Sequence, residues 1–291
     1  MGARTSANDH STFAGVVDDL ERLRFDSLWL SERISAPAPD PLIGLAVAAG
    51  RTSRIKLGMS VLVLPGRNPV VLAKELATLD RLSAGRLLPA FGLGVADPRE
   101  QEAFGVARAH RAGHVNEMVP LLRRLWTESD VAHDGKRFHY GSVTVLPRPV
   151  QQPLDLWMGG ISERELVRVG RLADGWLPSF CTPAEVETGI ATIEDVARQA
   201  DRAIDPEHFG VLIAYRDGQI PEELRAFVQR RRPGLDPDDL IPPLAGLPAM
   251  LHRFIDAGAS KFVVVPLTEP AAGDWSTHLD ELAASVLPLE T

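Results

Sequence analysis

Glu32 and Arg33 are neighbouring residues whose types could do chemistry, and they stand just after the apolar segment 25–30, behind Ser31. An acidic and a basic side chain in succession could contact the polar edge of a bound ring. They could equally form a surface ion pair, which is the commoner role of such neighbours. We take Glu32 and Arg33 as candidate catalytic residues and keep the ion pair as the alternative.

The segment Gly159-Gly160-Ile161-Ser162 is the best candidate for binding an anion such as a phosphate. Two glycines let a ligand approach the backbone closely. A helix that begins after Ser162 would direct free N–H groups and the positive end of its dipole at that ligand, and Arg164 or Arg168 could add charge. The alternative is an ordinary capping box in which Glu165 pairs with Ser162. Spacing alone gives the two interpretations equal weight.

Two neighbouring apolar segments end in residues that could line the same site. One ends in Met59-Ser60-Val61 and the other in Gly92-Leu93-Gly94. The second resembles part of a dinucleotide-binding fingerprint, but no third glycine follows at the required position and no helix begins at once. The alternative is a strand end that another backbone or a flat ligand approaches closely, for which glycine leaves room.

Other reactive residue types give weaker signals. His110 and His114 are four apart on an expected helix, but no third ligand indicates a metal site. Cys181 has no histidine partner placed by the sequence, so we expect it to be small apolar filler. The chain also lacks a Gly-x-Ser-x-Gly elbow, a Walker loop and a paired-carboxylate signature. This suits chemistry carried by a redox cofactor that the protein binds and orients.

Composition narrows the class of partner and the compartment. The chain has 291 residues, a net charge of -8 and an isoelectric point near 5.5. A net acidic chain without a long basic run has no electrostatic attraction to nucleic acid or anionic membranes. No apolar run approaches the roughly 18–20 residues of a membrane-spanning helix. The first residues lack the apolar core of a signal peptide, and a single cysteine excludes an internal disulfide, so we expect a cytoplasmic protein.

The elements that must position these residues alternate along the chain. Strands are expected at 25–30, 55–64, 87–93, 154–158, 175–180, 209–215 and 261–267. Helical segments lie between them, and Asp40-Pro41 and Asn68-Pro69 are typical helix starts. Strict alternation predicts parallel strands with right-handed crossovers, in a TIM (β/α)8 barrel or in a doubly wound open sheet. In either fold the ligand lies at the carboxyl ends of the strands.

The expected strands number seven, because the chain begins with what reads as the first helix; the first strand is therefore absent or divergent. No change of composition marks a domain boundary. We expect a single domain over 1–291, with excursions at about 128–153 and 216–243. The first excursion includes a hairpin with its turn at 133–136. The helical segment 100–127 is expected to break near Gly105 and again at Ala112-Gly113.

Four segments resemble the luciferase-like monooxygenase superfamily. They are RFDSLWLSERI (24–34), the segment 54–94 with its LD-x-LS-x-GR motif and Gly-x-Gly strand end, PRPVQQPLDLWMGG (147–160) and VGRLADGWLPS (169–179). The resemblance covers nearly the whole chain, and the combination of motifs is specific for the superfamily. Within the superfamily, the chain resembles actinobacterial oxidoreductases that depend on the deazaflavin coenzyme F420.

The resemblance implies a bacterial luciferase-like TIM barrel with a flavin or deazaflavin at its C-terminal mouth. A non-prolyl cis peptide after the third strand would support the cofactor ring, at Ser60-Val61 or, with the register shifted by one, at Met59-Ser60. The segment 159–162 matches the place that receives the cofactor phosphate. Gly92 and Gly94 match the strand end that passes the cofactor tail or ring.

Two features depart from the family pattern. Glu32 and Arg33 match an Asp-His pair that many deazaflavin-dependent relatives carry. Arg33 stays protonated and is a poor proton donor, but it could bind an anionic substrate or stabilise negative charge on the reduced ring. Relatives also begin with a strand before the first helix. If the chain starts too late, we expect it to express poorly and a version extended upstream by one strand to fold better; equal stability of the two would contradict this.

These expectations describe an F420-dependent oxidoreductase that transfers hydride between the reduced cofactor and a small organic substrate, which the sequence does not identify. The alternative within the enzymes is an FMN-dependent monooxygenase that uses reduced flavin and O2. The alternative of another class is a non-catalytic barrel that binds a flavin or a partner protein. The resemblance also implies a homo-oligomer, most simply a dimer. No metal is expected, because the sequence shows no third ligand beside His110 and His114.

Overall fold

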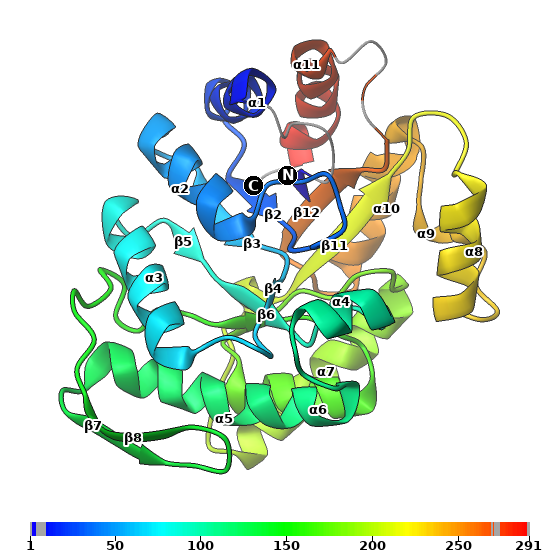
Figure 1. Cartoon of the computed structure of the whole chain (residues 1–291). Helices are drawn as coiled ribbons and strands as arrows, with labels where there is room; N and C mark the ends of the chain where they lie inside the picture. The colour runs from blue at the N-terminus through cyan, green and yellow to red at the C-terminus, as the bar shows by residue number, and fades with distance from the viewer. Residues whose placement is uncertain (1, 4–9, 269, 271–273, 290–291) are drawn as a thin grey trace.

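The computed structural model describes residues 2–3, 10–268, 270 and 274–289 of the chain. Its strands lie in the middle of the molecule with the main helices outside them (Figure 1). The barrel strands in chain order are β1 (Gly2–Ala3), β2 (Ser27–Leu30), β3 (Lys56–Met59) with β4 (Leu62–Val63), β5 (Leu87–Leu88) with β6 (Ala90–Gly92), β9 (Trp157–Met158), β10 (Gly175–Trp176), β11 (Gly210–Tyr215) and β12 (Lys261–Pro266).

Each barrel strand neighbours the next one along the chain. One parallel sheet has the order β1-β2-β3-β5, a second has the order β10-β9-β6-β4, and β11 pairs in parallel with β12. Isolated parallel bridges at Trp176–Phe209 and Ser179–Leu212 connect β10 to β11. Because β1 also lies against β12, the ring closes. The expected TIM barrel is confirmed, and the doubly wound open sheet is excluded.

The main helices follow the strands on the outside of the barrel. They are α1 (His10–Arg22), α2 (Pro41–Arg51), α3 (Pro69–Leu82), α5 (Arg108–Thr127), α6 (Glu163–Leu172), α7 (Pro183–Gln199), α10 (Leu247–Asp256) and α11 (Trp275–Val286). Smaller elements occupy the connections: α4 (Pro98–Ala103), the antiparallel hairpin β7 (Val131–Asp134) and β8 (His139–Val143), α8 (Glu222–Arg231) and α9 (Pro237–Leu240). No helix among the described residues is long and apolar enough to cross a membrane.

The first strand was expected to be absent or divergent, and it is not absent, because Gly2 and Ala3 form a short strand. They pair in parallel with Trp29 and Leu30 of β2. A strand of two residues, a glycine and an alanine, has no alternating apolar pattern that a sequence could reveal. Residues 4–9 lie outside the described residues.

Two helices begin as their sequences predict. The Asp40 carboxylate accepts a hydrogen bond from the N–H of Ile43 at 3.1 Å. The Asn68 side chain accepts from the N–H groups of Val70 and Val71. Proline at the first helical position has no N–H to lose, so the cap and the proline together start α2 and α3 at low cost.

The LD-x-LS-x-GR motif connects the end of α3 to neighbouring segments. The buried Asp80 carboxylate accepts hydrogen bonds from the N–H groups of Val150 and Gln151. The buried Arg86 guanidinium donates to the carbonyl oxygens of Ala49, Thr52 and Ile55. These bonds satisfy backbone groups that would otherwise be buried without partners. The motif therefore fixes the barrel that carries the site and does not line the site itself.

Large side chains in the barrel interior lie beside glycines. Trp29 is paired across the strands with Gly58, and Trp157 with Gly175. A Cβ added at Gly58 would lie 2.1 Å from the Trp29 ring, and one at Gly175 would lie 2.4 Å from the Trp157 ring. Each glycine is therefore required by a tryptophan on the neighbouring strand.

Several predicted bounds need correction. The strand expected at 55–64 is interrupted at Ser60-Val61, and the strand at 87–93 is interrupted at Pro89, which has no N–H for the ladder. The break expected at Ala112-Gly113 is wrong, since α5 runs through it. A glycine in a helix costs only about 1 kcal/mol, and the buried face of α5 against the core offsets that cost.

Candidate active site

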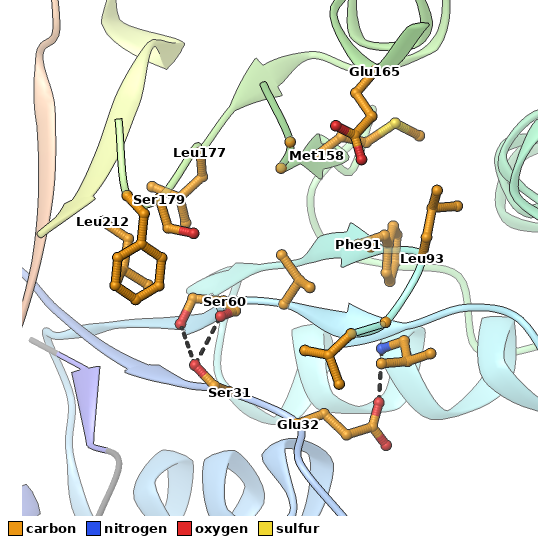
Figure 2. Close-up of a pocket in the computed structure, with 18 of the residues that line it drawn as sticks. Ser31, Glu32, Ser60, Phe91, Leu93, Met158, Glu165, Leu177, Ser179 and Leu212 are labelled. Atoms are coloured by element: carbon orange, nitrogen blue, oxygen red, sulfur yellow. Dashed lines mark hydrogen bonds between the residues drawn. The ribbon is translucent and has the colours of Figure 1, made fainter. Parts of the chain in front are cut away.

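One cavity at the carboxyl ends of the barrel strands brings together most of the residues singled out in the sequence (Figure 2). The predicted site residues that line it are Glu32, Arg33, Ser60, Val61, Gly92, Gly94, Gly159 and Gly160. Three others do not line it. The Met59 side chain is fully buried in the main core, Ser162 is exposed, and Ile161 lines a separate small cavity beside Trp176.

The peptide bond between Ser60 and Val61 is cis, which confirms the expectation drawn from the resemblance. It lies between β3 and β4 and is connected to the end of β2. The Ser60 N–H donates to the carbonyl oxygen of Leu30 at 2.9 Å, and the Glu32 N–H donates to that of Val61 at 3.2 Å. The Ser31 hydroxyl donates to the Ser60 carbonyl oxygen at 2.7 Å (Figure 2). The carboxyl ends of β2 and β3 are therefore connected to each other by hydrogen bonds.

The glycines at neighbouring strand ends make room for the connected ends of β2 and β3. A Cβ at Gly92 would lie 2.5 Å from Cγ2 of Val61. A Cβ at Gly159 would lie 3.0 Å from the carbonyl oxygen of Leu177 and 3.7 Å from Cγ1 of Val61. Gly94 has a positive φ of 78°, and a Cβ there would lie 2.5 Å from an Arg111 nitrogen. The glycines thus bring the strand ends together around Val61, which faces the cavity.

Glu32 forms an ion pair, but with Arg67 and not with its neighbour Arg33. Its carboxylate also accepts a hydrogen bond from the Val63 N–H at 2.7 Å, and Arg67 Nε donates to the Val63 carbonyl oxygen at 3.0 Å. Burial raises the pKa of Glu32, and the charge of Arg67 and the bond from Val63 oppose that rise. Glu32 therefore connects the end of β2 to β4 at the edge of the cavity.

Arg33 is held near Glu100 on α4. Arg33 Nε lies 3.6 Å from Glu100 Oε1 and is buried without a hydrogen-bond partner. Glu100 in turn accepts from the N–H groups of Ile34 and Ser35 and from the Ser35 hydroxyl. Burial alone would raise the pKa of Glu100, but these bonds outweigh it and keep the pKa below its ordinary value. Arg33 thus presents a fixed positive charge to the cavity.

The Gly159-Gly160 turn is fixed on one side by Trp176, whose Nε1–H donates to the Gly160 carbonyl oxygen at 2.8 Å. On the other side it meets Glu165. One Glu165 oxygen accepts from the N–H of Ile161 at 3.2 Å, from the N–H of Ser162 at 3.0 Å and from the Ser162 hydroxyl at 2.7 Å. The capping-box alternative for this segment is therefore present. The groups expected to bind an anion already bind the protein's own carboxylate.

Two arginines also line the cavity, Arg168 on α6 and Arg231 on α8. Arg168 Nε donates to the Asn116 side chain at 2.8 Å, and burial lowers the pKa of Arg168. Among the described residues, neither arginine has a carboxylate within ion-pair distance. The sequence indicated Arg168 but missed Arg231 and Phe227, because no local motif in the excursion at 216–243 shows which of its side chains reach the cavity.

Three other residues noted in the sequence do not line the cavity: Cys181, His110 and His114. Cys181 is buried, and burial raises the pKa of its thiol to about 12, which opposes formation of the nucleophilic thiolate at neutral pH. Across the described part of the chain, no group of three metal-ligating side chains comes together.

The cavity fits a flat ring better than it fits a phosphate. Its walls include the apolar side chains of Val61, Phe91, Met158 and Leu177, and the hydroxyls of Ser31 and Ser60 lie close together beside them (Figure 2). An apolar cleft with a few polar groups is the usual form of a cofactor site. At the expected phosphate position, however, the N–H donors are satisfied by Glu165.

A closed parallel barrel with a cavity at the carboxyl ends of its strands has the architecture of a TIM-barrel enzyme. The chain matches the family model for luciferase-like monooxygenases over residues 2–235. It therefore belongs to the luciferase-like monooxygenase family, as the motifs around Asp80, Gly92 and Gly159 predicted.

Relatives of known sequence or structure agree with this assignment. An F420-dependent glucose-6-phosphate dehydrogenase of Kineococcus radiotolerans is 32% identical over 189 residues, which are 61% of this chain and 55% of that protein. An uncharacterized protein of Mycobacterium tuberculosis is 30% identical over 193 residues, 65% of this chain and 66% of that one. The chain thus matches between about half and two thirds of the length of these relatives.

Among solved structures, an F420-dependent secondary alcohol dehydrogenase in complex with an F420–acetone adduct has a TM-score of 0.81. It is 18% identical and covers 100% of this chain and 98% of its own. At this identity the likeness concerns the fold.

Proposed function

We propose that this chain is an oxidoreductase that binds coenzyme F420 at the mouth of the barrel and transfers hydride between the reduced cofactor and a small organic substrate. The observation that carries the proposal is the position of Val61. Its side chain lies against Gly92 and Gly159 and faces a cavity with apolar walls and hydroxyls close by. The F420-dependent relatives support the choice of cofactor.

A bound deazaflavin supplies a ring carbon that donates or accepts hydride. The chain's part is to bind and to orient. Val61, Met158 and Leu177 would cover the ring and exclude water from the reacting atoms. The Ser31 and Ser60 hydroxyls, 3.2 Å apart, would hydrogen-bond the polar edge of the ring. Holding both reactants in a fixed orientation is the main contribution that a protein makes to such a transfer.

Arg33 and Glu32 take different roles in this proposal. Arg33 stays protonated and so does not act as a proton donor. Its guanidinium binds an anionic group of the substrate or stabilises negative charge on the reduced ring. Glu32 is engaged by Arg67 and Val63, and it acts by positioning the end of β2.

The second candidate is an FMN-dependent monooxygenase, which the description of the family favours. The ring-binding walls would serve either cofactor. A deazaflavin lacks the ring nitrogen through which reduced FMN reacts with oxygen, so the two cofactors imply different chemistry. A non-catalytic barrel that binds a flavin or a partner protein is the third possibility.

Equilibrium titration with each cofactor separates these functions. The pure protein is titrated with F420 and with FMN, and binding is followed by the change in cofactor fluorescence. We expect F420 to bind with the lower dissociation constant. Tight binding of FMN alone would contradict the F420 assignment. Cofactor that binds but is neither oxidised nor reduced with any member of a broad substrate panel would favour the non-catalytic barrel.

We place the substrate beside α8, which lies within the excursion at 216–243. The excursion and the barrel belong to a single domain in this proposal. Phe227 and Arg231 reach the cavity from this helix and are placed to select the substrate. A second copy of the chain would cover exposed apolar side chains on neighbouring helices, Ile43 and Val47 of α2 and Val71 of α3. This would make a cytoplasmic homodimer, which sedimentation at several concentrations can test.

A further inference from the structure

The first turn of α6 carries a carboxylate where the cofactor phosphate is expected. Glu165 accepts three hydrogen bonds there with one oxygen, from Ile161 and from the backbone and side chain of Ser162. These are the donors that an anion at this turn would need. The same carboxylate lines the cavity, on the side of Met158 (Figure 2).

The glycine of this turn makes room for Glu165. Gly160 has a φ of 102°, and a Cβ there would lie 2.5 Å from Cδ and 2.8 Å from Cβ of Glu165. The space that glycine leaves free is thus already filled from within the chain. Glu165 therefore both accepts from the N–H groups of Ile161 and Ser162 and fills the space beside Gly160.

The other capping box of the chain provides a comparison. At the start of α7, Glu185 accepts from the N–H and hydroxyl of Thr182 in the same way. That carboxylate also pairs with Arg232 and does not line the cavity at the barrel mouth. Both boxes stabilise a helix start, but only Glu165 places its negative charge in the cavity.

From these contacts we infer that Glu165 occupies the predicted phosphate position. Its carboxylate thereby determines the specificity of the site at the anionic end of the cofactor, by disfavouring a phosphate at this turn. This inference rests on the proposed cofactor-binding function. In the wild-type protein, a phosphate gains no hydrogen bonds at α6 and meets a like charge. A phosphate can enter only when the Glu165 side chain leaves. Arg168, three residues further on α6, is then within reach of the displaced carboxylate.

The test compares ligands with and without the phosphate. Dissociation constants are measured by fluorescence for FMN and riboflavin, which differ only in the phosphate. They are also measured for F420 and its ring with the ribityl chain alone, a pair that differs in the phosphate and in the tail beyond it. In the wild-type protein, the phosphate should improve affinity by less than about threefold. Glu165→Gln removes the charge and keeps an acceptor, and Glu165→Ala also frees the N–H groups. Both should increase the advantage of the phosphate by about tenfold or more, which corresponds to one charge-assisted hydrogen bond.

The control is Glu163→Gln on the same helix, because Glu163 is exposed and does not line the cavity. It should leave the ratio of the two dissociation constants unchanged. A large phosphate advantage in the wild-type protein that both Glu165 variants preserve would overturn the inference and leave the proposed function intact. If none of the four ligands binds the wild-type protein, the proposed function itself fails. Circular dichroism confirms that each variant is folded.

Discussion

At the scale of single residues, Val61 is the side chain that most determines the shape of the cavity. The ends of three other strands make room for it or bond to its backbone: Gly92, Gly159 and Glu32. Gly92 and Gly159 act on a ligand indirectly, by allowing Val61 its position, and not by leaving space for the ligand itself.

Gly92→Ala should therefore perturb both stability and binding. The added Cβ would lie 2.5 Å from Val61 Cγ2, and relieving the overlap should cost about 1–3 kcal/mol. The displaced Val61 should also weaken cofactor binding. The matched control is Gly15→Ala, where nothing lies within 4 Å of the added Cβ; on helix α1 it should gain up to about 1 kcal/mol. Urea denaturation and cofactor titration measure both effects, and equal behaviour of the two variants would contradict the role of Gly92.

Glu100→Gln should lower the free energy of unfolding by about 1–3 kcal/mol at pH 7, because it weakens the charge-assisted bonds from Ile34 and Ser35. Although burial opposes the shift, these bonds hold the pKa of Glu100 below its ordinary value. A carboxyl with a lowered folded pKa stabilises the fold above its unfolded pKa, about 4.3, and loses that contribution as the pH falls through the folded pKa. The cost of the substitution should therefore shrink in acid.

Chemical denaturation of the wild-type protein and of Glu100→Gln, at pH 7 and again near the pKa of Glu100 in the folded protein, tests whether the cost of the substitution falls in acid. Glu102→Gln, on the same helix but exposed, should show little cost at either pH. A cost of Glu100→Gln that is equal at both pH values would show that the bonds do not depend on the charge.

At the scale of elements, the sequence motifs separate into those that build the barrel and those that line the cavity. The LD-x-LS-x-GR motif builds the barrel: Asp80 and Arg86 bind backbone groups of other segments and do not reach the cavity. The strand ends at Ser60 and Gly92 line it. The LD-x-LS-x-GR motif is therefore evidence of the barrel fold and not of the chemistry in the cavity.

Asp80→Ala tests the structural role of the motif. It removes the buried carboxylate that the N–H groups of Val150 and Gln151 bind, and we expect a loss of about 3 kcal/mol or more. Glu75→Ala, exposed on the same helix, should lose less than about 0.5 kcal/mol. Chemical denaturation of both variants provides the comparison, and a loss at Asp80 no larger than at Glu75 would refute the assignment.

The elements also show what a sequence can predict and what it cannot. Local signals predicted the helix starts at Asp40 and Asn68, because caps act within a few residues. The resemblance predicted the cis bond at Ser60-Val61. The pairing of Glu32 with Arg67 was missed, since the partner is 35 positions away. The occupation of the anion position by Glu165 stayed one of two alternatives, because a capping box and an anion site have the same sequence.

At the scale of the whole molecule, the cavity is formed by contributions from β2, β4, β6, β9, β11 and α8 together. The ring closes only through the short strand Gly2–Ala3 between β2 and β12. A ligand that contacts all of these strand ends has its site only in the folded barrel. Cofactor binding should therefore be coupled to the stability of the complete fold.

This coupling predicts a thermal shift. A ligand that binds only the folded state, at a free concentration of about 100 times its dissociation constant, adds about 2.7 kcal/mol to the free energy of unfolding. For a domain of 291 residues, that should raise Tm by roughly 4 °C. F420 should produce the shift, and Gly15→Ala should preserve it in full. Because Gly92→Ala moves Val61, it should reduce the shift at the same F420 concentration. If F420 binds by fluorescence but leaves Tm unchanged, the ligand does not occupy the barrel mouth, because no site built from so many strand ends could survive unfolding.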